Sequence, residues 1–202
     1  MNELIMNDRQ HLDLGCGAKP RNPYNCSQLF GVDIYKAPGA SNSDIRIANL
    51  SVEPIPFASD SFDSLSAFDF IEHIPRILPT ADGKTRFPFI ELMDEVWRVL
   101  KPGGIFYAVT PAYPSPEAFQ DPTHVNIITA KTHLYFCEEK LYAENYGFKG
   151  KFKASRVEWV HIKYAQSASV DMKTRLSSLN RTLFKARPAH LLWELVALKP
   201  QA

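Results

Sequence analysis

The alternation of short apolar runs with longer polar segments constrains the fold of this chain more than any other feature. Runs with the length of a buried strand occupy 11–14, 29–34, 44–50, 62–68 and 104–110. Short apolar runs of this kind are typical of strands in a parallel sheet, and the segments between them suit crossover connections. We therefore expect an α/β fold with a mainly parallel sheet covered on both faces.

Further elements are predicted in the second half of the chain. Apolar residues share one helical face between Phe87 and Leu100, and the following Pro102-Gly103-Gly104 ends that helix. A second helical pattern spans 132–146. Strands are expected at 156–164 and 191–198, with a polar helical stretch at 169–185 between them.

Composition limits the class of protein. The chain has 202 residues, 45% of them hydrophobic, which suits one domain over 1–202. Its net charge of +1 favours neither nucleic acid nor an anionic membrane. Three cysteines without C-x-x-C spacing fit a reducing compartment, and no signal or spanning segment is evident, so we expect a cytoplasmic location without membrane attachment.

A glycine turn follows the first predicted strand. Gly15 and Gly17 flank Cys16, and Asp33 ends the next strand 18 positions after Gly15, where its carboxylate could bind ribose hydroxyls. The glycine pair alone fits a tight turn without a ligand equally well. A dinucleotide is disfavoured because the third glycine is missing and Asp13 would repel a pyrophosphate. A ligand that carries an ammonium or sulfonium group, such as S-adenosylmethionine, fits better.

Five segments in order resemble one known family. They are Leu12-Asp13-Leu14-Gly15-Cys16-Gly17-Ala18-Lys19-Pro20, Gly31-Val32-Asp33-Ile34, the stretch 55–63, Ile71-Glu72-His73-Ile74 and the stretch 95–104. The pattern resembles the class I S-adenosylmethionine-dependent methyltransferases of the type 11 group. The resemblance implies a Rossmann-like, seven-stranded sheet with an antiparallel last strand and helices on both faces. It divides the chain into a cofactor-binding core at 11–137 and C-terminal strands at 138–202, with an insertion at 165–190.

The resemblance also implies which residues bind the cofactor S-adenosylmethionine and its product S-adenosylhomocysteine. The methionine end is assigned to the first strand and the glycine turn, the ribose to the end of the second strand, adenine to the next loop and the methyl-donor pocket to the end of the fourth strand. These positions are Asp13, Gly15, Cys16, Gly17, Asp33, Ile34, Asn49, Leu50 and Phe68. A core aromatic is an equal alternative for Phe68.

Candidates for the chemistry lie after the fourth and fifth predicted strands. Methyl transfer needs alignment of the acceptor, and an oxygen acceptor also benefits from a base. His124 is a candidate base, with substrate anchoring and a structural loop contact as alternatives. Asp69 is a second candidate, or a helix cap, and Asp121 would orient His124 or cap a turn.

Other site types are not favoured by the sequence. The six histidines show no zinc-type spacing, so no metal is expected from the sequence, although folding could still assemble a site. Basic residues at 149–163 lack an aromatic platform, which disfavours nucleic acid. The segment before the first strand is short and the crossover at 17–29 carries prolines, so a second copy of the chain or the 165–190 segment could close an open cofactor pocket.

Together these features predict a methyltransferase that acts at oxygen on a small-molecule or glycan acceptor. The alternative is a methyltransferase-like domain that binds the cofactor, or serves as a scaffold, without turnover. A nicotinamide-dependent oxidoreductase is disfavoured by the missing third glycine and by Asp13.

Overall fold

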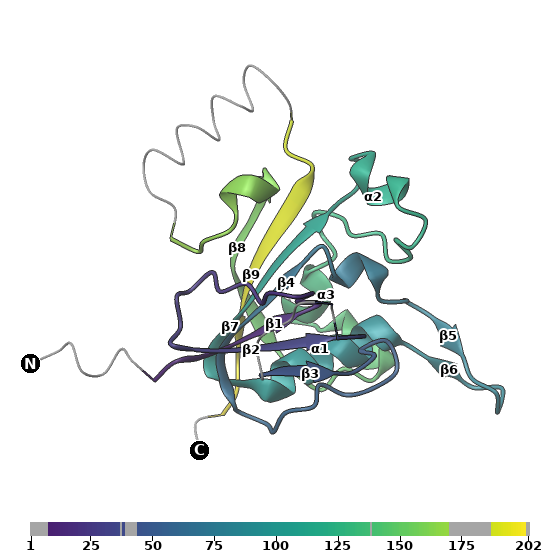
Figure 1. Cartoon of the computed structure of the whole chain (residues 1–202). Helices are drawn as coiled ribbons and strands as arrows, with labels where there is room; N and C mark the ends of the chain where they lie inside the picture. The colour runs from purple at the N-terminus through teal and green to yellow at the C-terminus, as the bar shows by residue number, and fades with distance from the viewer. Residues whose placement is uncertain (1–7, 37, 39–43, 138, 170–186, 201–202) are drawn as a thin grey trace, which may run out of the picture.

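The chain folds around a seven-stranded sheet (Figure 1). The structure is a computed structural model that describes residues 8–36, 38, 44–137, 139–169 and 187–200. The strands of the sheet are β1 (Gln10–Leu14), β2 (Gln28–Asp33), β3 (Ile45–Ile47), β4 (Phe62–Phe68), β7 (Leu100–Pro111), β8 (Phe152–Val160) and β9 (His190–Ala197). The order is β3-β2-β1-β4-β7-β9-β8, and β9 is antiparallel to both its neighbours while the other pairs are parallel. The expected Rossmann-like sheet with an antiparallel last strand is confirmed.

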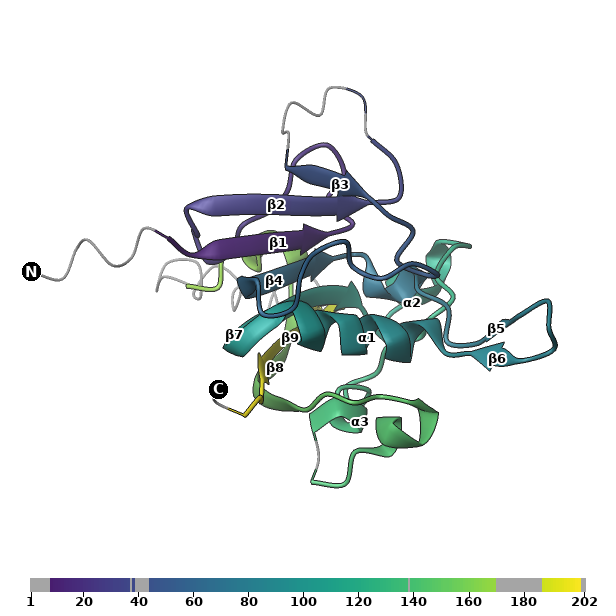
Figure 2. The ribbon, with the colours of Figure 1, turned by 90° about the horizontal axis from the view of Figure 1, so that it is seen from below.

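Two α-helices cover one face of the sheet. Helix α1 (Pro88–Val99) begins with Pro88 in its first turn, where a missing N–H costs nothing, and ends where Leu100 becomes extended. Figure 2 shows α1 lying along the sheet beside β7. The buried residues of α1 join the main core, and Phe89 packs edge-on against Phe136 of α3 (Leu134–Cys137), with ring centroids 5.7 Å apart. The remaining short elements are η1 (Ile71–His73), β5 (Leu78–Pro79), β6 (Thr85–Arg86), α2 (Glu117–Gln120), η2 (Tyr142–Tyr146) and η3 (Ile162–Tyr164).

The other face has a thinner cover. Within the described part of the chain, no α-helix lies between β1 and β4, and the loop 15–27 packs on this face together with η3. Pro20 and Pro23 explain the loop, because each lacks the N–H that a helix would use. Tyr24 anchors the loop to the sheet. Its ring lies edge-on to the Tyr107 ring, with centroids 5.9 Å apart, and its hydroxyl donates to Glu194 Oε1 at 2.8 Å.

Three predicted elements differ from the structure or fall outside it. The expected helix at 132–146 is instead α3 followed by η2, because Leu141 is extended and enters the core separately from Phe136. The strand expected at 156–164 is shifted toward the N-terminus, as β8. The stretch 170–186, which holds most of the expected helix at 169–185 and of the 165–190 insertion, lies outside the described residues. None of the described helices is long and apolar enough to span a membrane.

Candidate functional site

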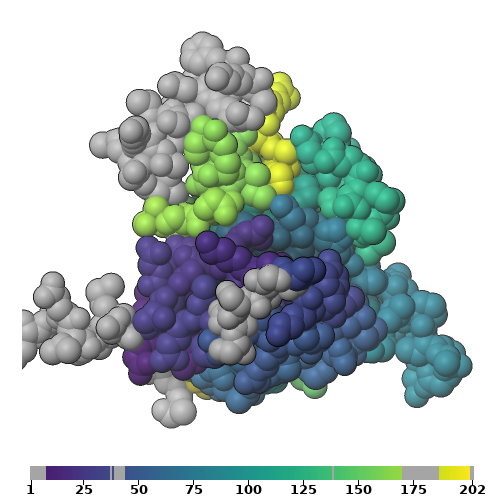
Figure 3. Space-filling model, in the orientation of Figure 1, coloured from purple at the N-terminus to yellow at the C-terminus, as the bar shows by residue number. Residues whose placement is uncertain are grey.

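The predicted site residues gather at one edge of the sheet. Strands β1, β2, β4 and β7 are parallel, so their carboxyl ends meet there, and ligands of such folds bind outside that edge. Because β9 is antiparallel, it begins at the same edge with His190. The loop that carries α2 lies beside the start of β9, seen in yellow in the space-filling view (Figure 3).

The glycine turn is fixed to β2 by its backbone. The N–H groups of Gly15 and Cys16 donate to the Val32 carbonyl, and the N–H of Gly17 donates to Asp33 Oδ2 at 2.8 Å. Both glycines have positive φ, +64° and +58°. A Cβ on Gly15 would lie 2.4 Å from the Phe70 ring, whereas one on Gly17 would meet nothing within 4 Å. Gly15 is therefore required by both space and conformation, and Gly17 by conformation alone.

Asp33 and its neighbours have the chemistry of a nucleoside site. The Asp33 carboxylate is half-buried at the end of β2, and the next side chain, Ile34, is 55% exposed. A carboxylate beside an exposed apolar side chain can accept from ribose hydroxyls and contact a base. Asn49 follows β3, and its Oδ1 accepts from the Ser51 N–H at 3.1 Å, which leaves its amide N–H groups for donation. These residues fit the adenosyl part of the expected cofactor.

Asp13 and Cys16 support the turn from inside. Asp13 is 0% exposed; Ser66 Oγ donates to its Oδ1 at 2.6 Å and the Arg21 N–H to its Oδ2 at 2.8 Å. Burial raises the pKa of Asp13 to about 7. The Cys16 thiol packs on Gly31, where a Cβ would lie 2.6 Å from Sγ, and burial raises its pKa to about 12. Asp13 and Cys16 therefore position the turn through these contacts, and their assignment to the methionine end of the cofactor stays a prediction.

Leu50 and Phe68 also face inward. Leu50 belongs to the core on the α1 face and lines a cavity of about 290 Å³ beside that helix. Phe68 is 2% exposed in the smaller core on the opposite face, where the Arg21 guanidinium lies 4.8 Å from its ring centroid. Both side chains lie in the core, which for Phe68 was the alternative interpretation, and the assignment of the two residues to the cofactor site stays a prediction.

Asp69 pairs with a histidine that the sequence did not mark. The N-cap of η1 is Phe70 and has no side-chain cap, so Asp69 does not cap this helix. Its Oδ1 instead lies 3.0 Å from His190 Nε2, and its own φ is +47°. Asp69 and His190 are 121 residues apart, so only the antiparallel placement of β9 could have indicated their proximity.

His124 and Asp121 lie in the loop after β7. His124 Nδ1 is 3.3 Å from the Ala118 carbonyl, its Nε2 is 3.9 Å from Asp121 Oδ2, and its ring is edge-on to His73 at 4.8 Å. Asp121 Oδ1 accepts from both the N–H and the hydroxyl of Thr123, and these bonds hold the pKa of Asp121 below its usual value. The contacts with Thr123 are those of a turn cap, one of the two roles expected for Asp121.

Glu72 completes a cluster with the two histidines. Its Oε2 accepts from Thr110 Oγ1 at 2.8 Å, while Oε1 is buried and has no hydrogen-bond partner in the part of the chain that the structure describes. Burial raises the pKa of this carboxyl to about 7. Glu72, His73 and His124 each offer one metal-ligating atom, and these atoms lie within 4.8 Å of one another. Spacing along the chain could not indicate this cluster, because 51 residues separate its two histidines.

Comparisons with known proteins identify the fold. A family model described as a methyltransferase domain matches residues 12–108. An S-adenosylmethionine-dependent methyltransferase from Mesorhizobium loti is 20% identical, with 95% of this chain and 92% of that chain covered and a TM-score of 0.55. A SAM-dependent methyltransferase from Archaeoglobus fulgidus is 16% identical (96% and 87% covered, TM-score 0.55), and the [4+2]-cyclase SpnF is 18% identical (98% and 77% covered, TM-score 0.57). No curated protein sequence matches the chain.

Proposed function

Because residues 12–108 belong to the class I S-adenosylmethionine-dependent methyltransferases of the type 11 group, we propose that this protein methylates a hydroxyl oxygen of a small-molecule or glycan acceptor. The observation that carries the proposal is the Asp33 carboxylate, which the Gly17 N–H holds at the sheet edge beside exposed Ile34. This arrangement suits an adenosyl group next to the ends of β4 and β7 and the start of β9, where an acceptor can be placed.

The contacts and exposure of these residues support the following cofactor-binding roles. Asp33 accepts from the ribose hydroxyls, Ile34 contacts the adenine, and Asn49 donates to it. The backbone of the glycine turn lies against the methionine end. Asp13 acts indirectly, since it holds the Arg21 N–H and with it the loop that follows the turn.

The chemistry requires little from the protein beyond alignment and removal of a proton. Bound S-adenosylmethionine supplies a methyl group on a sulfonium, so the acceptor oxygen can attack it directly. His190 is the proposed base: with its Nε2–H donated to Asp69, its Nδ1 can take the hydroxyl proton. The His124 ring packs on His73 and its Nδ1 lies 3.3 Å from the Ala118 carbonyl, which makes it less suited to this role.

Turnover with a panel of hydroxyl acceptors tests the proposal. Release of S-adenosylhomocysteine is measured for the wild type and for His190→Gln. We expect the substitution to lower kcat about 100-fold or more without changing cofactor affinity, because the base acts only during methyl transfer. Glu117→Gln, on the neighbouring loop, serves as the control.

Two results would contradict this account. Equal turnover by wild type and His190→Gln would remove His190 from the chemistry. Cofactor binding without product over the whole acceptor panel would favour the cofactor-binding scaffold instead. The cyclase SpnF has a similar fold, so the fold alone does not determine the reaction.

A further inference from the structure

Three potential metal ligands meet at the edge of the sheet. Glu72 and His73 come from η1, and His124 comes from the loop after β7. Their ligand atoms lie within 4.8 Å of one another, and the two imidazole rings are in edge contact. Two histidines and one carboxylate form a donor set that zinc and other divalent first-row transition metals prefer.

Hydrogen bonds select the tautomer of His73. The Thr123 hydroxyl has a single proton, and it donates this proton to Asp121 Oδ1 at 2.7 Å. The same oxygen lies 3.0 Å from His73 Nδ1, so in this contact Nδ1 carries the proton and Thr123 accepts it. The lone pair of a neutral His73 is therefore on Nε2.

His124 is fixed in the same tautomer by a different partner. Its Nδ1 lies 3.3 Å from the Ala118 carbonyl, which can only accept, so Nδ1 carries the proton and Nε2 has the lone pair. A metal-ligating histidine usually donates its other ring N–H to a carbonyl or polar oxygen in this way. Asp121 Oδ2, 3.9 Å from His124 Nε2, adds negative charge beside the cluster.

Glu72 provides independent support for a cation. The residue is 1% exposed, and among the described residues only one of its two carboxylate oxygens finds a hydrogen-bond partner. A buried carboxylate oxygen without a partner is destabilising, and a cation is the partner that a carboxylate binds most strongly. The backbone also holds Glu72 in place, because its carbonyl accepts from the N–H groups of Val125 and Asn126, just after His124.

We propose that Glu72 Oε1, His73 Nε2 and His124 Nε2 bind one divalent transition metal ion, of which Zn²⁺ is the representative. Imidazole ligands disfavour Mg²⁺ and Ca²⁺, which prefer all-oxygen sites. Three protein ligands leave a coordination position for water or another oxygen ligand. The three ligands include neither the proposed cofactor contact Asp33 nor either residue of the Asp69–His190 pair.

Metal titration of the untagged full chain tests the proposal. After treatment with EDTA and dialysis, Co²⁺ is added and its visible absorption is followed, and Zn²⁺ binding is measured by calorimetry. We expect one ion per chain and a melting temperature that rises with Zn²⁺. His73→Ala and His124→Ala should each weaken binding about tenfold or more.

Controls separate loss of a ligand from loss of folding. In Glu72→Gln the amide oxygen can still accept from Thr110, but it is a weaker metal ligand than a carboxylate, so metal binding should also weaken. His190→Ala lies outside the cluster and should bind the metal as the wild type does. Circular dichroism confirms that each variant is folded. Absence of saturable binding, or equal binding by the wild type and folded His73→Ala and His124→Ala, would overturn the proposal. Neither result depends on cofactor binding, so the metal site and the proposed function can fail separately.

Discussion

A chain of buried hydrogen bonds supports the glycine turn from below. Ser66 donates to Asp13, so it accepts from His11 Nε2 at 2.9 Å, and His11 Nδ1 then accepts from Ser64 Oγ at 2.7 Å. Burial lowers the pKa of His11 to about 3, which keeps the imidazole neutral. All hydrogen bonds of the network therefore point the same way, from Ser64 through His11 and Ser66 to Asp13. The Asp13 carboxylate is the last acceptor and also binds the Arg21 N–H in the loop 15–27.

The first prediction concerns the pH dependence of stability at Asp13. Its pKa is about 7 in the folded chain against an ordinary aspartate value of 3.8, so between these pH values the folded state binds more protons than the unfolded state. The unfolding free energy of the wild type relative to Asp13→Asn should therefore fall as pH rises from about 4 to 7, by at most about 4 kcal/mol. Urea unfolding at pH 4.5 and 8 measures this, and a pH-independent difference would refute it.

The second prediction compares the two glycines of the turn. Both alanine substitutions strain a positive φ, at about 1–2 kcal/mol, but only Gly15→Ala also meets the Phe70 ring. Gly15→Ala should therefore lower the unfolding free energy more than Gly17→Ala, as measured by denaturant unfolding. Equal losses would mean that Phe70 moves aside freely.

For single residues, the sequence predicts the place along the sheet better than the direction in which the side chain points. Gly15, Gly17 and Asp33 lie at the edge where the strand pattern places them. The inward direction of Asp13, Cys16 and Phe68 was not predictable, because strands buried on both faces carry no alternation that marks one face.

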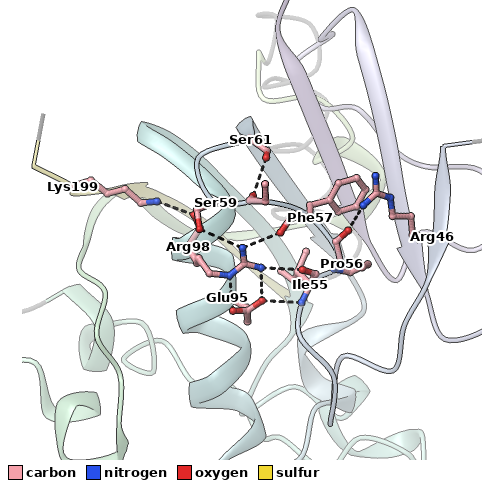
Figure 4. A network of polar contacts seen from close by, with 10 residues as sticks. Arg46, Ile55, Pro56, Phe57, Ser59, Ser61, Glu95, Arg98 and Lys199 are labelled. Carbon is pink, nitrogen blue, oxygen red and sulfur yellow. Dashed lines mark hydrogen bonds and ion pairs between the residues drawn. The ribbon is translucent and has the colours of Figure 1, made fainter. Parts of the chain in front are cut away.

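Among the elements, the loop 55–61 depends on one arginine of α1. Figure 4 shows the Arg98 guanidinium between the Glu95 carboxylate and the carbonyls of Ile55 and Phe57, to which it donates at 2.9 Å each. Glu95 in turn accepts from the Ile55 N–H at 2.9 Å. This network positions the connection that leads into β4.

The third prediction tests this network. Arg98→Met keeps much of the apolar stem but leaves two carbonyls and a carboxylate without their donor, so we expect a loss of about 2–3 kcal/mol of unfolding free energy. Lys84→Met removes an ion pair whose lysine side chain is 80% exposed and should change stability by less than about 0.5 kcal/mol. Chemical denaturation compares the two, and similar losses would argue against an anchoring role for Arg98.

Helices were predictable where local and tertiary preferences agree. In α1 the proline start and the apolar face match the packing, and its observed bounds are close to those predicted. At 132–146 the helical spacing is present, but the core takes Phe136 and Leu141 from separate short elements. Tertiary packing overrides local propensity there.

Across the whole molecule, the two faces of the sheet are covered unequally. The α1 face has helices, whereas the opposite face depends on the loop 15–27, η3 and polar contacts such as Tyr24 with Glu194. Glu194 also pairs with Arg156 of β8 at 3.0 Å. The loop thereby connects the first strand of the chain to the last.

The fourth prediction follows from this connection. Tyr24→Phe removes the hydrogen bond to Glu194 and keeps the ring, so the loop should open more often at a cost of about 1 kcal/mol. Trypsin should then cleave the Arg21–Asn22 bond several-fold faster than in the wild type. Unchanged cleavage would show that packing alone holds the loop.

The contacts between residues far apart in the chain could not be predicted from the sequence. The seven-stranded sheet with its antiparallel last strand was expected from a family resemblance, and the fold agrees with it. His190 beside Asp69, and His124 beside Glu72 and His73, are pairings across 121 and about 50 residues that depend on how the sheet edge is assembled.

The central claim is that Asp33 and the glycine turn bind an adenosyl sulfonium cofactor. Calorimetric titration with S-adenosylmethionine and S-adenosylhomocysteine, with a nicotinamide dinucleotide as the control ligand, tests it most directly. We predict micromolar binding of the first two and none of the third, and Asp33→Ala should weaken binding by about 1–3 kcal/mol. Asp82→Ala, in the turn between β5 and β6, should bind as the wild type does. Absence of binding by either adenosyl ligand, or equal affinity for the folded Asp33→Ala variant, would contradict the account.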